Sequence, residues 1–174
     1  MRGHCILSHG FESGPDATKV TALADVAQRL GFSHERPDYT AFDGRREAGS
    51  LGDVAARLDF LRERARAAPV GRPLVLAGSS LGAWVSARAS LEFDVSGLFL
   101  MAPPIRLAAG FPLDAARVPT SIIHGWGDEL IPADDVVAWA ATRRATLLLV
   151  DDGHRLSAHV EASAHAFATL LGGL

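Results

Sequence analysis

A serine between two glycines carries the clearest chemical signal in this chain. Ser80 stands within Gly78-Ser79-Ser80-Leu81-Gly82, after the apolar run 74–77 and before a segment with helical periodicity. A strand, a sharp turn and a helix in this order lift a serine hydroxyl above the edge of a sheet. The turn strains its central residue, and glycines two positions before and after it remove side chains that would collide. Because the five-residue pattern also arises by chance, the rest of the chain must supply the chemistry.

Two later segments supply the partners that a nucleophilic serine requires. Its hydroxyl needs a neighbouring base, for which imidazole is suited, and a carboxylate that orients the imidazole. Asp128 follows the apolar run 119–124, and His154 follows the apolar run 145–150. The order serine, aspartate, histidine is the one that parallel sheets with this serine turn use. The sequence thus predicts Ser80 as nucleophile, Asp128 as orienting acid and His154 as base.

Other residues compete for these roles. Glu129 is the main alternative to Asp128, whereas Asp151 and Asp152 also suit a turn or a cap before the last helix. Ser79 lacks the flanking glycines and is expected to point into the scaffold.

The developing negative charge on an acyl oxygen needs N–H donors. Leu81 offers one at the start of the helix after Ser80, where the helix dipole helps. Phe11 offers the second in the loop after the first strand, and Gly10 is expected to let the chain turn so that this N–H faces the substrate.

Two further histidines, His9 and His124, and the single cysteine have simpler interpretations than catalysis. His9, His124 and His154 could form a zinc site, but the acyl-transfer chemistry explains each, and we expect His9 and His124 to bond neighbouring loop backbone. Cys5 lies early in a strand and is expected to be a core thiol. The sequence predicts neither a metal nor another cofactor.

Short apolar runs alternate with segments of helical period along the whole chain. Several runs are continuously apolar, as strands covered on both faces are. Strands are predicted at 4–8, 32–38, 73–78, 96–101, 119–124 and 145–150. Helices are predicted at 16–30, 50–68, 81–91, 132–142 and 156–171, with Asp16 and Ser50 as candidate caps of the first two. Three prolines break any long helix within 102–118.

This alternation predicts a single α/β domain over residues 1–174, with a doubly wound, mostly parallel six-stranded sheet and helices on both faces. In the strand order 2-1-3-4-5-6 the winding reverses between the first and third strands, and ligands bind at the carboxyl ends there. The loop 9–15 and the Ser80 turn both fall at this point.

Composition narrows the function classes. The 174 residues are 48% hydrophobic and 21% charged, with a formal net charge of −3 that gives no electrostatic case for nucleic acid or an anionic membrane. No apolar run approaches the roughly 20 residues that span a bilayer. The N-terminus shows no signal-peptide pattern and the single Cys5 excludes an internal disulfide, so a cytoplasmic location is expected.

With these pieces in place, the chain resembles the α/β-hydrolase family over nearly its whole length. The resemblance rests on His9-Gly10-Phe11, on the nucleophile elbow 78–82, on the stretch 124–132 and on Gly153-His154. It implies the same roles for Ser80, Asp128 and His154 and the same two oxyanion donors. Two differences stand out: the first two strands usual in the family are missing, and 102–118 is too short for a lid domain. The chain looks like a small, lidless, bacterial esterase-like member.

An open, lidless site favours small or loosely held substrates. The candidates for contacts with the substrate are Glu12, Trp84, Ile105, Trp126 and Leu130, while Arg45 and Arg46 are expected to be solvated loop charges.

The leading hypothesis is a serine hydrolase of carboxylic esters or thioesters that works through an acyl-Ser80 intermediate. A non-catalytic binding protein on the same scaffold is one alternative, because a fold does not fix a function. An acyltransferase or peptidase with the same three residues is another. The sequence leaves the substrate, the acyl chain length and the oligomeric state open.

Overall fold

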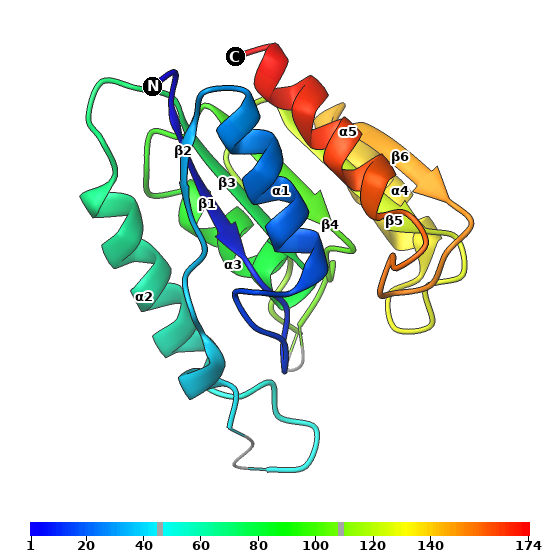
Figure 1. Ribbon diagram of the computed structural model, residues 1–174. Coiled ribbons are helices and arrows are strands. Elements are labelled where there is room, and N and C mark those ends of the chain that lie inside the picture. The colour runs from blue at the N-terminus through cyan, green and yellow to red at the C-terminus, as the bar shows by residue number, and fades with distance from the viewer. Residues whose placement is uncertain (45–46, 108–109) are drawn as a thin grey trace.

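A parallel sheet forms the centre of the molecule. The computed structural model describes residues 1–44, 47–107 and 110–174, and in these ranges six parallel strands have the order β2-β1-β3-β4-β5-β6 (Figure 1). The strands are β1 (His4–Ser8), β2 (Ser33–Glu35), β3 (Leu74–Ser79), β4 (Gly97–Met101), β5 (Thr120–Gly125) and β6 (Thr146–Val150). The predicted fold class and strand order are confirmed.

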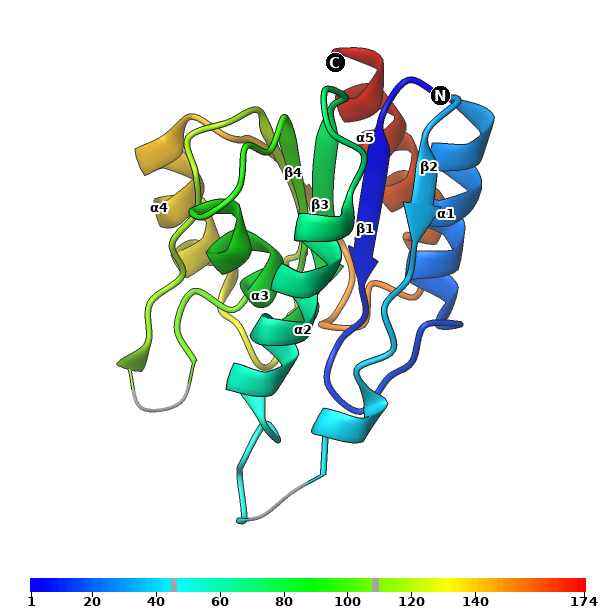
Figure 2. The same cartoon turned by 90° about the vertical axis from the view of Figure 1, so that its left-hand side faces the viewer.

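Helices cover both faces of the sheet. Within the described ranges they are α1 (Thr18–Arg29), α2 (Val54–Ala67), α3 (Leu81–Ser90), α4 (Ala133–Arg143), α5 (Val160–Gly172) and a short 3-10 turn, Thr40–Phe42. Figure 2 shows α1 and α5 on one face and α2, α3 and α4 on the other. None of the described helices is long and apolar enough to cross a bilayer.

Each strand contributes to two apolar layers. Because side chains alternate across a strand, Ile6 and Leu76 face the α2–α4 side, whereas Leu7 and Val75 face the α1–α5 side. All four are fully buried. This explains the continuous apolar runs, since neither face of the central strands meets water.

The carboxyl ends of the strands lie together at the lower edge in Figure 2, and both chain termini lie at the opposite end. All strands run in the same direction, so the loops after β1, β3, β5 and β6 gather at this edge. The winding reverses between β1 and β3, as predicted.

Some local predictions were wrong. Neither Asp16 nor Ser50 caps a helix: the N-cap of α1 is Ala17, without a side-chain bond, and the N-cap of α2 is Asp53, whose carboxylate accepts the N–H of Ala56. Ser50 instead closes a turn by accepting the N–H of Gly52. The second strand is only three residues long, because the chain at 36–38 leaves the sheet edge.

The segment 102–118 contains no α-helix among its described residues. It holds one antiparallel bridge between Arg106 and Pro112, while Ala108 and Ala109 lie outside the described residues. A lid domain is absent from this described part of the chain.

Two glycines allow the closest backbone approaches around the serine turn. A Cβ at Gly82 would overlap the carbonyl oxygens of Ser8 and His9 at the end of β1. A Cβ at Gly78 would overlap the backbone of Gly82 itself. The predicted steric reason for both glycines is therefore confirmed, and it extends to a third element, β1.

Gly82→Ala should lower the free energy of unfolding by about 3 kcal/mol, because backbone rather than a flexible side chain must move. Urea denaturation measures this. Gly172→Ala is the matched control: it lies in α5 with open space around its Cβ position, and its effect should stay within about 1 kcal/mol. Equal effects of the two substitutions would contradict the steric argument.

Candidate active site

The Ser80 turn holds its residue in a strained conformation. Ser80 has φ 53° and ψ −118°, in the left-handed region that non-glycine residues avoid. Its N–H donates to the carbonyl of Met101 at the end of β4 (2.8 Å), which anchors the turn to the sheet. Ser80 is half-buried, whereas Ser79 before it is 4% exposed and belongs to β3. As expected, only Ser80 is presented at the edge of the sheet.

Three side chains from three different loops meet at this turn. Ser80 Oγ lies 2.9 Å from His154 Nε2, and His154 Nδ1 lies 2.8 Å from Asp128 Oδ2. A carboxylate can only accept, so the imidazole proton resides on Nδ1 and Nε2 is left to accept the Ser80 proton. The structure thus brings together the three residues that the sequence singled out.

The carboxylate of Asp128 is fixed on its other side. Its Oδ1 accepts the N–H groups of Leu130 (2.9 Å) and Ile131 (2.8 Å), and its side chain is fully buried. His124 lies behind it, with Nε2 donating to the carbonyl of Ile131 (2.9 Å) and 3.5 Å from Asp128 Oδ2. A carboxylate held by two backbone donors cannot rotate freely, so it orients the imidazole.

The competing carboxylates have other positions. Glu129 accepts the backbone N–H of His154 (3.2 Å) and does not bond the imidazole. Asp152 accepts the N–H groups of Gly153 (2.8 Å) and Ala158 (3.0 Å) and pairs with His159. This last hydrogen bond lowers the pKa of Asp152. Asp152 therefore organises the turn before α5.

The two expected oxyanion donors belong to segments that lie close to Ser80. Leu81 begins α3, where the first N–H groups have no intrahelical acceptor. Phe11 follows Gly10, whose Cβ position would lie 3.3 Å from the carbonyl oxygen of Ser79. Gly10 itself is not in the left-handed region; Glu12 is, with φ 52°. The expected reason for Gly10 was therefore wrong, because close approach to the serine turn, and not its own backbone freedom, explains the glycine.

A buried ion pair holds the loop after β1. Arg57 of α2 is 1% exposed and binds both carboxylate oxygens of Asp43, at 2.8 and 3.0 Å. It also donates to the carbonyls of His9 (2.7 Å) and Gly10 (3.2 Å). Asp43 in turn accepts the N–H of Glu12 (3.1 Å). Burial lowers the pKa of Arg57, and the Asp43 charge opposes that shift.

His9 belongs to the same assembly. The N–H of Tyr39 donates to His9 Nε2 (3.0 Å), so the imidazole proton is on Nδ1, which donates to the Gly10 carbonyl (2.8 Å). Burial is the main cause that lowers the pKa of His9. The prediction that His9 and His124 bond nearby backbone is confirmed.

The other predicted residues are readily placed. Cys5 is fully buried, and burial raises the pKa of its thiol to about 12, as suits a core residue. Among the described residues, no three His, Cys, Asp or Glu side chains are arranged to hold a metal ion. Arg45 and Arg46 lie outside the described residues.

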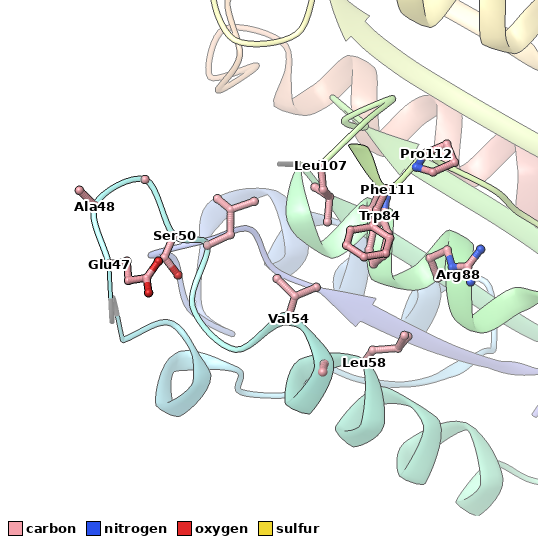
Figure 3. Close-up of a pocket in the computed structure, with 13 residues that line it drawn as sticks. Glu47, Ala48, Ser50, Val54, Leu58, Trp84, Arg88, Leu107, Phe111 and Pro112 are labelled. Carbon is pink, nitrogen blue, oxygen red and sulfur yellow. The ribbon is translucent and has the colours of Figure 1, made fainter. Parts of the chain in front are cut away.

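Three of the five expected substrate contacts line one of two cavities. The larger, about 650 Å³, lies between α2, α3 and the residues Leu107, Phe111 and Pro112, and is lined in part by Trp84; we call it the α2–α3 cavity (Figure 3). The smaller, about 470 Å³, is lined in part by Ile105 and Leu130; we call it the α4 cavity. Trp126 is 56% exposed and lines neither cavity, and neither does Glu12.

Sequence reasoning missed Arg57, Asp43 and the walls of the larger cavity. A usable signal existed for Arg57, because position 57 falls on the same helical stripe as the apolar residues Val54 and Leu61. An arginine there must either disturb the stripe or find a buried acid. No comparable signal identified Asp43, since its partner comes from another element.

Comparison with solved structures shows what the chain is similar to. A proposed hydrolase of the alpha/beta superfamily from Xanthomonas campestris pv. campestris is 63% identical, with 99% of this chain and 100% of that chain covered and a TM-score of 0.96. Est1E from Butyrivibrio proteoclasticus is 18% identical, with 98% and 87% covered and a TM-score of 0.76. A Xanthomonas campestris α/β serine hydrolase without lid is 21% identical, with 97% and 81% covered and a TM-score of 0.64. No protein-family model and no curated protein sequence matches the chain.

Arg57→Met should lower the free energy of unfolding by about 3–5 kcal/mol, because it leaves the Asp43 carboxylate buried without its cation. Arg62→Met on the same helix is the matched control. Arg62 pairs with Asp59 and Glu92, which are both exposed, and its loss should cost at most about 1 kcal/mol. Urea denaturation of both variants measures the difference, and similar losses would refute the importance of the buried pair.

His9 predicts a pH dependence of stability. Because its pKa is lowered in the folded state, the unfolded chain takes up a proton first as pH falls below about 6.5. The contribution of neutral His9 to the free energy of unfolding is therefore fully present above this pH. The free energy of unfolding decreases from pH 7 to pH 5. His9→Gln, which can still accept the Tyr39 N–H, should show a smaller decrease than the wild type, whereas His165→Gln on the exposed side of α5 should not. Urea titrations at both pH values provide the test.

Proposed function

The chain belongs to the α/β-hydrolase superfamily, and on that basis we propose that it is a serine hydrolase of carboxylic esters or thioesters, with Ser80, His154 and Asp128 as its catalytic residues. The observation that carries the proposal is the hydrogen-bonded line from Ser80 Oγ through His154 to Asp128, with distances of 2.9 and 2.8 Å. This is the arrangement that activates a serine hydroxyl.

In the first half-reaction Ser80 Oγ attacks the acyl carbon while its proton moves to His154 Nε2. The bond from the acyl carbon to the alcohol oxygen, or to the thiol sulfur, then breaks. His154 gives its proton to this leaving group, and an acyl-Ser80 ester remains. In the second half-reaction His154 takes a proton from water, the hydroxide oxygen attacks the ester, and Ser80 leaves with the proton from His154.

The loop after β1 supports the same chemistry. Carbonyl and N–H of one trans peptide point in opposite directions. Arg57 and His9 both donate to the Gly10 carbonyl, so they fix the plane of the peptide that carries the Phe11 N–H. A donor with a fixed direction stabilises an oxyanion without reorganisation during the reaction. We propose the N–H groups of Phe11 and Leu81 as the oxyanion donors.

A binding protein without catalysis is the second candidate from the sequence. A binding role alone does not require a strained Ser80 backbone, which is energetically costly and concentrates at functional sites. The geometry does not separate hydrolysis from transfer of the acyl group to an acceptor other than water, which product analysis decides.

Ser80→Ala should lower kcat by about 10⁴-fold for p-nitrophenyl acetate and leave the fold intact, because it removes the nucleophile. Ser79→Ala, one position earlier in β3, is the matched control and should change kcat by less than about threefold. A fluorophosphonate probe should form an adduct on Ser80 in the folded wild type and not in Ser80→Ala. Wild-type rates in Ser80→Ala would disprove the assignment, and a folded wild type without adduct would favour the binding protein.

A further inference from the structure

The α2–α3 cavity has no role in the mechanism described so far. Its volume of about 650 Å³ lies in the range of pockets that enclose small organic ligands. We propose that it binds the apolar acyl group of the substrate. This assignment deepens the proposed function and rests on it.

The cavity begins next to the nucleophile. Ser80 is the N-cap of α3, and its carbonyl accepts the N–H of Trp84 (3.1 Å), while Arg88 lies about one helical turn after Trp84. Trp84 and Arg88 line the cavity, which therefore starts about one helical turn, about 5 Å, from Ser80. In Figure 3, Leu107 and Phe111, in the segment that follows the strand β4 to which Ser80 is anchored, lie beside Trp84. Val54 and Leu58 of α2 form the other side of the cavity.

The position of His154 indicates that the acyl group, and not the leaving group, enters this cavity. The leaving group must face His154, which protonates it, and His154 and Asp128 follow β6 and β5. The α2–α3 cavity lies toward the opposite half of the sheet, where α3 packs beside α2. The α4 cavity, lined by Leu130 and Ile131, lies on the Asp128 side. An ester on Ser80 thus extends its acyl part toward α2.

The chemistry of the lining favours an uncharged, apolar occupant. Val54 and Leu58 on the apolar stripe of α2, and Leu51 in the loop before it, are only half-buried because they border the cavity. Phe111 on the other wall is 62% exposed. The charged residues among the described lining, Glu47 and Arg88, have opposite signs, so the lining carries no net charge. An aliphatic chain or an aromatic ring matches these walls.

The first test compares p-nitrophenyl acetate with p-nitrophenyl hexanoate. Each methylene that enters the cavity should raise kcat/KM of the wild type by about fourfold. Val54→Trp narrows the cavity from the first turn of α2. It should lower kcat/KM for the hexanoate at least tenfold and change that for the acetate less than about twofold. Val70→Trp, at a position 96% exposed beyond the far end of α2, is the matched control and should behave as the wild type.

Ala138→Trp examines the rival site, since Ala138 lines the α4 cavity. It should leave the ratio of hexanoate to acetate turnover unchanged. If Ala138→Trp lowers this ratio and Val54→Trp does not, the acyl group binds in the α4 cavity and the proposal is overturned.

The second test does not depend on catalysis. The chain has three tryptophans, and their indole N–H signals report three places: Trp84 the α2–α3 cavity, Trp139 the α4 cavity and Trp126 the exposed surface. In ¹⁵N-labelled protein, hexanamide should shift the Trp84 signal, and acetamide should shift it far less. The shift should persist in Ser80→Ala and disappear in Val54→Trp.

The two proposals fail separately. Ser80-dependent hydrolysis without a chain-length preference, and with no Trp84 shift, overturns the acyl site and leaves the proposed function in place. A Trp84 shift that Val54→Trp abolishes, in a protein without Ser80-dependent hydrolysis, overturns the proposed function and retains the cavity as an apolar ligand site. Absence of both signals overturns both.

Discussion

The close approach of three backbone segments at Gly82 is the constraint on which the candidate site depends. The end of β1 comes so near to the first turn of α3 that no Cβ fits at Gly82, and Gly78 in β3 lies so close to the backbone of Gly82 that no Cβ fits there either. This contact fixes the distance between the loop that carries Phe11 and the residue at the helix N-terminus, Leu81. It also requires the sharp turn that places Ser80 at φ 53°. Backbone contacts therefore set the positions of the loop after β1, the Ser80 turn and the start of α3.

The candidate site also requires that the loop after β1 be held in place without covering Ser80. A large side chain above Ser80 would block substrate, so the support comes from behind the loop. There Arg57 reaches through the apolar layer to two carbonyls, and Asp43 balances its charge. The face of Tyr39 lies under the guanidinium at 4.6 Å and adds a cation–π contact. A buried ion pair contributes little net stability, and its use here is geometric.

The helix α2, which carries Arg57, also forms part of the cavity beside the site. Arg57 occupies part of the inner stripe of α2, and Val54 and Leu58 beside it are only partly buried against the core and line the cavity. A chain without a lid can thus still offer a partly enclosed apolar surface, formed where apolar side chains of a helix are only half-buried. The expectation of a shallow, open cleft is consistent with half-buried Ser80, but the molecule beside Ser80 is more hollow than a lidless chain suggests.

The sequence by itself determined the strand order and the three residues that meet at Ser80. Those signals are local: apolar runs, glycine spacing and the position of each polar residue directly after a strand. Because parallel strands end at one edge, these local facts suffice to bring Ser80, Asp128 and His154 together. Only the tertiary structure decided between Asp128 and Glu129, adjacent residues whose different partners depend on the path of the turn. It alone revealed Asp43 as the partner of Arg57, and the cavity, because both arise between elements far apart in the chain.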